Sequence, residues 1–260
     1  MDAAQAAIAA NLGALPRDLA SVTPAAVVAI SGWDDADLLG GCLASVSAQG
    51  WPVVYLDGAY RTYAPRGEWR TPDAALAPLR VRWPFVAWYA APQSGPWETE
   101  AEKRTAVLGL AVLQARARGI GWVLCLDTDE RVVGPPGALQ RWLDAEDGRE
   151  SLWWAMVNLY SEDRPGLRAG YLLPRLIRVA DGLAFHPPRD FELYRGGVRM
   201  AYLEGEVPSG ADAGRWAVVP RNALRIRHDR AQRPARRLAQ SGSYIRVREG
   251  RPIEGDTTAW

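Results

Sequence analysis

One segment indicates the fold class of this 260-residue chain: Trp122-Val123-Leu124-Cys125-Leu126-Asp127-Thr128-Asp129-Glu130. Its first five residues are apolar without interruption, which is typical of a strand buried on both faces of a parallel sheet. Three of the next four residues are carboxylic acids, so the predicted strand ends in an acidic turn. Because ligands of open α/β sheets bind outside the carboxyl ends of the strands, this turn is the first candidate for a functional site.

A strand, a helix and a second strand are predicted upstream. Residues 25–31 form a short, β-branched run between Pro24 and Gly32, and residues 52–56 form a similar run. Between them, Asp34 or Asp35 is placed to cap a helix. The apolar residues of that helix recur on one face at helical spacing: Leu38, Leu39, Cys42, Leu43 and Val46. This is a βαβ unit, for which a right-handed crossover is expected.

A third strand is predicted at residues 85–89, after an irregular, proline-rich passage. A helix follows, with a capping box formed by Thr99 and Glu102 and with Gly119 just beyond its end. Strands that alternate with helices in this way predict a doubly wound α/β sheet. The second half is more mixed, with longer strands predicted at residues 152–160 and 171–179.

Charge is unevenly distributed along the chain. Basic and acidic residues number 31 and 30, and Lys103 is the only lysine. Ten arginines and two acids lie between Arg221 and Arg251, a local charge of +8 that leaves −7 for the rest. The composition is that of a globular protein and excludes disorder and coiled coils. Cys42 and Cys125 lie in apolar runs, so we expect free thiols in a reducing compartment. Because no apolar run is long enough for a membrane span, we expect no such span and a cytoplasmic location.

Asp127 and Asp129 are candidate metal ligands. Carboxylates two residues apart in an extended segment point the same way, and hard oxygen ligands suit Mg²⁺ or Mn²⁺. His228 alternates with Leu224 and Ile226, which predicts an inward imidazole that could complete the coordination. The alternatives are an acidic turn in which an aspartate acts as a cap, and a histidine that is simply hydrogen bonded in the core.

Together these residues resemble the nucleotide-sugar glycosyltransferases of the GT-A fold, particularly family 2. The resemblance rests on Ser31 after the first strand, Asp57 after the second, Lys103-Arg104 near the start of a helix, the Asp-x-Asp-Glu motif and the late His228. It covers about the first 130 residues, and beyond them only His228 and the stretch from Pro174 to Arg178. It implies a Rossmann-like, mixed, mostly parallel sheet flanked by helices, in a single domain with a basic C-terminal extension. The expected parts are an N-terminal helix (1–20), the catalytic domain (24–220, with a nucleotide-sugar half at 24–133 and an acceptor half at 150–220) and a basic segment (221–260) that closes over the site.

The resemblance also assigns roles to residues. Asp57 would bind the nucleobase, and Ser31, Lys103, Arg104 and Asp127 would line the nucleotide site. Asp127, Asp129 and His228 would hold Mn²⁺ or Mg²⁺, and the ion would stabilise the departing diphosphate as a Lewis acid. Basic residues of the C-terminal segment, Arg227 and Arg230, would add to that stabilisation. The implied donor is a nucleoside diphosphate sugar, with UDP favoured over GDP because it is the more frequent in the family.

A general base is needed to deprotonate the acceptor hydroxyl if the reaction inverts the sugar, and Asp190 and Glu192 are the candidates. Some relatives carry His-Glu in this region, where this chain has His186-Pro187. A retaining reaction stays open. The acceptor could be a glycan, a small molecule or a modified nucleic acid.

Two other functions compete with glycosyl transfer. The basic segment could bind nucleic acid, since ten arginines could neutralise several phosphates, and a sugar transferase acting on modified DNA bases would combine both features. A nucleotidyltransferase would share the sheet and the metal. It would usually carry a glycine-rich basic loop after the first strand, where this chain has the acidic Ser31-Gly32-Trp33-Asp34-Asp35.

Overall fold

A computed structural model describes residues 24–61, 69–146, 152–162, 170–186, 192–199 and 216–229. The predicted N-terminal helix and most of the basic segment lie outside these ranges. In chain order the elements are β1 (Val27–Gly32), α2 (Ala36–Ser47), β2 (Val53–Asp57), α3 (Asp73–Arg82), β3 (Val86–Tyr89), α4 (Glu100–Ala117), β4 (Trp122–Asp127), β5 (Glu130–Val133), α5 (Ala138–Glu146), β6 (Trp154–Tyr160), β7 (Tyr171–Arg178), β8 (Leu183–His186), β9 (Glu192–Arg195), β10 (Val198–Arg199), β11 (Trp216–Val218) and β12 (Arg225–His228).

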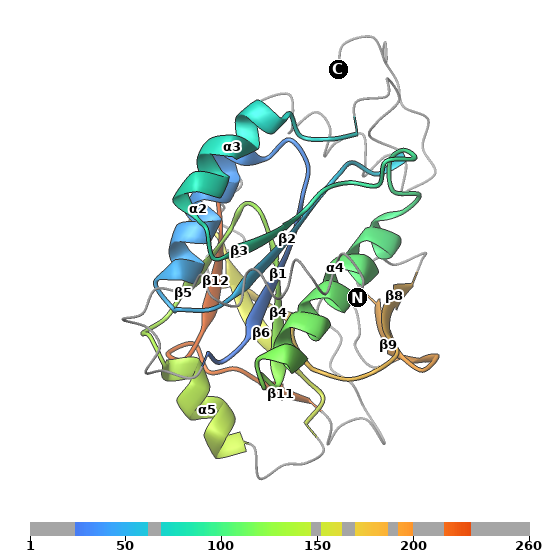
Figure 1. Cartoon of the computed structure of the whole chain (residues 1–260). Coiled ribbons are helices and arrows are strands. Elements are labelled where there is room, and N and C mark those ends of the chain that lie inside the picture. The colour runs from blue at the N-terminus through green and yellow to red at the C-terminus, as the bar shows by residue number, and fades with distance from the viewer. Residues whose placement is uncertain are drawn as a thin grey trace.

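A mixed, mostly parallel sheet forms the centre of the molecule (Figure 1). Its order is β3-β2-β1-β4-β7-β6-β12-β5, with β11 also paired with β6. The first four strands are parallel, and β7 enters antiparallel between β4 and β6. Since β12 is parallel to β6, the strands β4, β6 and β12 all run in one direction and end at the same edge. This architecture confirms the predicted α/β fold class.

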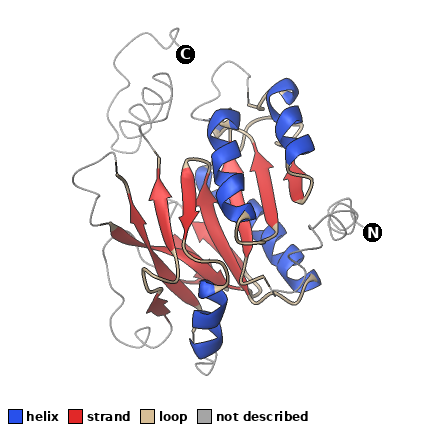
Figure 2. Ribbon diagram, turned by 90° about the vertical axis from the view of Figure 1, so that its left-hand side faces the viewer, coloured by secondary structure: helices blue, strands red, loops and turns tan. Residues whose placement is uncertain are grey.

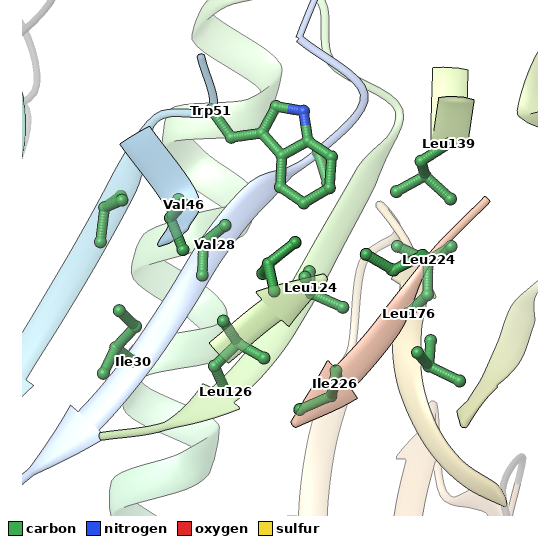
Figure 3. Close-up of a cluster of buried hydrophobic side chains, with 14 of the residues drawn as sticks. Val28, Ile30, Val46, Trp51, Leu124, Leu126, Leu139, Leu176, Leu224 and Ile226 are labelled. Atoms are coloured by element: carbon green, nitrogen blue, oxygen red, sulfur yellow. The ribbon is translucent and has the colours of Figure 1, made fainter. Parts of the chain in front are cut away.

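Helices cover both faces of the sheet (Figure 2). Alternate residues of β1 belong to two hydrophobic clusters: Val28 and Ile30 pack with residues of α2, α3 and α5, whereas Val27 and Ala29 pack with α4. Figure 3 shows the first cluster, where side chains of β1 and β4 lie together with Val46 and Trp51. Burial on both faces explains why β1 and β4 are continuous apolar runs rather than alternating patterns.

Two elements differ from the sequence expectation. The passage expected to be irregular contains α3, which the sequence hides because Pro78 lies inside it and Leu76 is its one buried residue. The acidic turn is also shorter than expected, since Glu130 already begins β5. The predicted capping box is half formed: the Thr99 hydroxyl accepts from the Glu102 N–H, whereas the Glu102 carboxylate accepts from the Glu98 N–H.

The strand β12 lies at the start of the predicted basic segment, and it is part of the central sheet. It pairs with β6 on one side and with β5 on the other, and Ile226 is fully buried. Residues 225–228 therefore belong to the core of the domain, and the remainder of the segment, from residue 230, lies outside the described residues. In the part of the chain that the structure describes, no helix combines the length and the apolar character needed to cross a membrane.

Candidate active site

Chemically active side chains gather at the edge where β4 and β12 end. Ser31 is paired with Asp127 across β1 and β4, and Asp57 ends the neighbouring β2. Farther along the same sheet, His228 at the end of β12 is paired with Glu130 at the start of β5. The strand order thus brings residues that are distant in the sequence to one edge, as the carboxyl ends of a parallel sheet require.

Asp129 and His228 are in direct contact. Asp129 Oδ2 lies 2.8 Å from His228 Nε2, and the Asp229 N–H donates to the Asp129 carbonyl at 2.8 Å. The Asp129 side chain is completely buried, and 18% of the His228 side chain is exposed. The structure therefore brings together two of the three residues that were predicted as metal ligands.

Asp127 is held between two arginines. Its Oδ1 accepts a hydrogen bond from Arg104 of α4, and its Oδ2 accepts one from Arg175 of β7, both at 3.0 Å. Each guanidinium also has a second carboxylate partner: Glu100 lies 2.7 Å from Arg104, and Glu130 lies 2.6 Å from Arg175. These five side chains form one charged network, which we call the arginine–carboxylate cluster.

Arg175 lies at a bulge in β7. Pro174 has no N–H to donate to a neighbouring strand, and a proline inside a central strand is found at bulges. The pairing with β6 shifts here: two consecutive residues of β6 oppose Leu176 and Pro174, so Arg175 is left out of the ladder. Bulges redirect side chains and are frequent beside active sites. This one accompanies the turn of Arg175 toward Asp127 and Glu130.

The three acids of the turn differ in burial. The side chains of Asp129 and Glu130 are 0% and 2% exposed, whereas 28% of the Asp127 side chain is open to solvent. The pKa of Glu130 is raised to about 7: burial is the largest cause, the charges of Asp127 and Asp129 add to the rise, and Arg175 and His228 oppose it. Of these three acids, a ligand that arrives from solvent would therefore meet Asp127 first.

The donor chemistry of Asp129 and His228 fits a divalent ion. Carboxylate oxygen and imidazole nitrogen suit Mn²⁺, and neighbouring ligands at right angles, each about 2.1 Å from an ion, lie about 3 Å apart. Asp127 is placed differently, since a guanidinium lies against each of its oxygens. Among the described residues, no three His, Cys, Asp or Glu side chains are grouped as ligands of one ion. Asp129 and His228 therefore fit as ligands of a divalent ion, and Asp127 could join them only if it gave up its hydrogen bonds with the two arginines.

Asp57 is tied to the loop that precedes α3. Its Oδ2 accepts from the Thr71 N–H at 2.8 Å, and its Oδ1 accepts from the Thr71 hydroxyl at 2.5 Å and from the Tyr55 hydroxyl at 3.3 Å. Asp57 is 4% exposed and Ser31 is 9% exposed. Asp57 thus anchors the loop after β2, and the nucleotide contacts of Asp57 and Ser31 stay predictions.

Lys103 joins the ends of β1 and β2 from inside the domain. Its ammonium donates to the carbonyl oxygens of Gly32 and Gly58, both at 2.6 Å, and the residue is 1% exposed. Burial lowers the pKa of Lys103 to about 7, although Asp57 and Glu100 favour the charged form. The contacts of Lys103 fix the two loops that border the site, and its predicted contact with a nucleotide is not tested by them.

Replacing Lys103 by methionine is expected to lower the free energy of unfolding. The change leaves the Gly58 carbonyl without its Lys103 donor and the Gly32 carbonyl with the Gly58 N–H alone, and a buried acceptor that loses its partner costs about 1–3 kcal/mol. Urea unfolding measures the loss. Arg80→Met is the matched control, because Arg80 forms an exposed ion pair with Asp73, and such pairs contribute about 0–1 kcal/mol.

The same variant carries a pH signature. Because the pKa of Lys103 is lowered in the fold, the unfolded chain binds more protons than the folded protein between about pH 7 and pH 10.5. The contribution of Lys103 to stability therefore rises with pH across that window, and Lys103→Met should lack this rise. Equal stability of Lys103→Met and the wild type, with parallel pH profiles, would contradict this role.

The other predicted residues fall in different places. Arg227 donates to both oxygens of Asp229, at 2.8 and 3.3 Å, and so faces a carboxylate. Glu192 is paired with His186 in the small antiparallel sheet of β8, β9 and β10. Asp190 and Arg230 lie outside the described residues. The roles proposed for these four residues stay predictions.

Several residues of the site carry no signal that spacing alone would reveal. Thr71 lies in the passage before α3, where no element was predicted, and its hydroxyl donates to Asp57. Glu100 accepts a hydrogen bond from Arg104. Arg131 donates to the Thr128 carbonyl at 3.0 Å and lies 3.3 Å from Asp229, so it braces the acidic turn against the end of β12. For Arg175 a signal did exist: a proline immediately before it, within a strand pattern.

Comparisons with known proteins give limited similarity. No protein-family model matches the sequence, and no curated protein matches it. Among solved structures, the chain is similar to S. aureus TarS, with 13% identity and a TM-score of 0.41 over 59% of this chain and 28% of that one. TarS 1–349 matches with 13% identity and a TM-score of 0.41 over 59% of this chain and 47% of that one. TarS 1–349 in complex with UDP matches with 14% identity and a TM-score of 0.38, over 53% and 36%. The chain thus spans less than half the length of the structures it matches.

Proposed function

We propose that this protein transfers a sugar from a nucleoside diphosphate sugar, with a UDP-sugar favoured, to a hydroxyl group of an acceptor. One observation carries the proposal: Asp129 and His228 meet at 2.8 Å, beside the arginine–carboxylate cluster, at the carboxyl edge of the parallel strands. The combination supplies a pair of metal-type ligands and two strong phosphate donors in one place, which a simple acidic cap does not need.

Arg104 and Arg175 are the groups that would meet the diphosphate. In the reaction the bond between the sugar anomeric carbon and the phosphate oxygen breaks, its electron pair leaves with the diphosphate, and a new bond forms to the acceptor oxygen. Guanidinium groups fixed in advance by Glu100 and Glu130 need no reorganisation to stabilise the added negative charge. When a divalent ion is bound, Asp129 and His228 would hold it, and it would add Lewis-acid stabilisation of the same charge.

Asp127 is the residue whose partners would change on donor binding. Phosphate oxygens compete with its carboxylate for the N–H groups of Arg104 and Arg175, since both are anionic acceptors that guanidinium binds in the same geometry. An Asp127 released from the arginines would become available beside Asp129. We therefore expect nucleotide and metal to bind more tightly together than either does alone.

The proton of the acceptor hydroxyl must also be removed. In an inverting reaction it would pass from the acceptor hydroxyl to a general base, for which Asp190 and Glu192 remain the proposed candidates.

Differential binding separates this proposal from nucleic-acid binding. In thermal-shift titrations we expect UDP or a UDP-sugar with Mn²⁺ to stabilise the protein more than GDP does, by the linkage between binding and unfolding. DNA alone should give a smaller, salt-sensitive shift. A thermal shift with DNA, and no thermal shift with any nucleotide in the presence or absence of Mn²⁺, would favour the nucleic-acid alternative.

A further inference from the structure

A second charged cavity lies away from the acidic turn. It has a volume of about 410 Å³ and is lined by Arg116, Trp153, Arg178, Asp181 and Arg195, together with the short segment between Arg178 and Asp181. Ligand cavities in proteins commonly measure about 300–1,000 Å³, so the size suits a small organic molecule. The lining is polar and is contributed by the end of α4, the end of β7 and the end of β9.

This cavity is distinct from the candidate active site. Arg178 is paired with Trp122 at the start of β4, whereas Asp127 stands at the end of the same strand. Five residue steps of about 3.3 Å place the two positions about 17 Å apart, at opposite edges of the sheet. A ligand of one site would therefore not contact the other.

The charge of the cavity favours an anion. Three guanidinium groups face one carboxylate, Asp181, which lies 2.7 Å from Arg116. That ion pair is exposed, with 44% and 90% of the two side chains open to solvent, so water and salt screen it and it holds Arg116 only weakly. The lining thus carries a formal excess of two positive charges.

Two of the arginines are oriented by neighbouring rings. The Arg195 guanidinium lies 4.3 Å from the ring centre of Trp153, and that of Arg178 lies 5.9 Å from the ring centre of Trp122. Arg178 also donates to the Leu152 carbonyl at 3.3 Å. Guanidinium groups packed on aromatic rings keep their charge and lose less side-chain freedom when they bind an anion.

We propose that this cavity binds an organic phosphate. A phosphate monoester carries up to two negative charges, which match the excess of the lining, and guanidinium groups bind its oxygens in pairs. A phosphate ion alone would fill only a small part of the volume, so the ligand carries a further polar group. The phosphate would belong to a free metabolite, and the proposal does not depend on the function of the other site.

Calorimetric titration with glucose 6-phosphate, glucose and inorganic phosphate tests the proposal. We expect glucose 6-phosphate to bind, inorganic phosphate to bind more weakly, and glucose alone not to bind. Arg195→Gln should weaken the affinity about 10-fold or more, as expected for a lost charge-assisted hydrogen bond. Arg116→Gln, at an exposed position, provides a second variant whose folding is not at risk.

Asp181→Asn is expected to change the affinity for glucose 6-phosphate in the opposite direction, which makes it the more discriminating variant. It removes the one carboxylate that the described residues contribute to the cavity and releases Arg116, so the affinity for glucose 6-phosphate should rise several-fold. Arg80→Gln, on the exposed surface of α3, is the control and should leave the affinity unchanged. Absence of binding by both phosphates, or an affinity that Arg195→Gln and Asp181→Asn leave unchanged, would overturn the proposal. If UDP competes with glucose 6-phosphate and Asp127→Asn abolishes this competition, the ligand binds at the other site, and the proposal is overturned as well.

Discussion

An Asp127→Asn variant is expected to fold and to lose about 100-fold or more of its donor turnover, the loss typical when a group that stabilises transition-state charge is removed. The fold should survive because each arginine keeps a second carboxylate: Arg104 keeps Glu100, and Arg175 keeps Glu130. Turnover should fall because a neutral amide neither balances the two guanidinium groups nor serves as an anionic ligand once the diphosphate has displaced it.

The measurement for this variant is release of the nucleoside diphosphate from the donor, with circular dichroism to verify the fold. Asp73→Asn is the matched control, since Asp73 is an exposed aspartate at the start of α3 with 89% of its side chain in solvent. Wild-type turnover in Asp127→Asn would show that the acidic turn is only structural. Loss of the fold would show that the second carboxylates do not compensate.

Arg175→Met is expected to separate metal binding from turnover. Without Arg175, the site carries one more negative charge, and one oxygen of Asp127 loses its hydrogen bond. The affinity for Mn²⁺ in the absence of nucleotide should therefore rise, by about 10-fold for about 1.4 kcal/mol of removed competition. Donor turnover should fall about 100-fold or more, because a donor to the diphosphate is lost.

Arg175→Met also leaves Glu130 buried without its guanidinium, so its stability should be measured alongside. Arg175→Lys keeps the charge and serves as the second variant: one ammonium replaces the planar guanidinium whose Nη2 now donates to both Asp127 and Glu130, and turnover should still fall. Mn²⁺ titrations followed by electron paramagnetic resonance report the affinity, and Arg80→Met is the control. An unchanged or weaker Mn²⁺ affinity in Arg175→Met would contradict the competition between Arg175 and the metal for Asp127.

The parts of the fold that were predictable are those determined by local burial. The runs that became β1, β2 and β4 are buried along nearly their whole length, and the apolar face of α2 repeats at helical spacing. α3 was missed because a helix with one buried residue and an internal proline lacks that pattern. β12 was placed in an extension because arginines dominate its sequence, although Ile226 between them is fully buried.

The acidic part of the site was predictable for a different reason. Asp127 and Asp129 follow a buried strand directly, so their position at the sheet edge is a local property, and the alternation around His228 placed its imidazole correctly toward the interior. The arginines depend on long-range pairing. Nothing close to Arg175 in the sequence indicates Asp127, and the antiparallel pairing of β7 with β4 brings them together.

Lys103 shows the limit of reasoning from composition. A lone lysine at the start of a helix suggests a solvated charge or a ligand contact, because lysines are seldom fully buried. In the structure its ammonium is buried and bridges two strand ends, so the position is explained by the loops it fixes. Its burial follows from the packing of α4 against β1 and β2, which no local pattern encodes.

We propose that the edge formed by Asp127, Asp129 and His228 binds a nucleoside diphosphate together with a divalent ion. The most direct measurement is the thermal stability of the wild-type protein with UDP alone, Mn²⁺ alone and both together. We expect the shift with both to exceed the sum of the separate shifts, and Asp127→Asn to remove this excess. The absence of stabilisation by UDP, GDP and their sugar conjugates, with and without Mn²⁺, would contradict it.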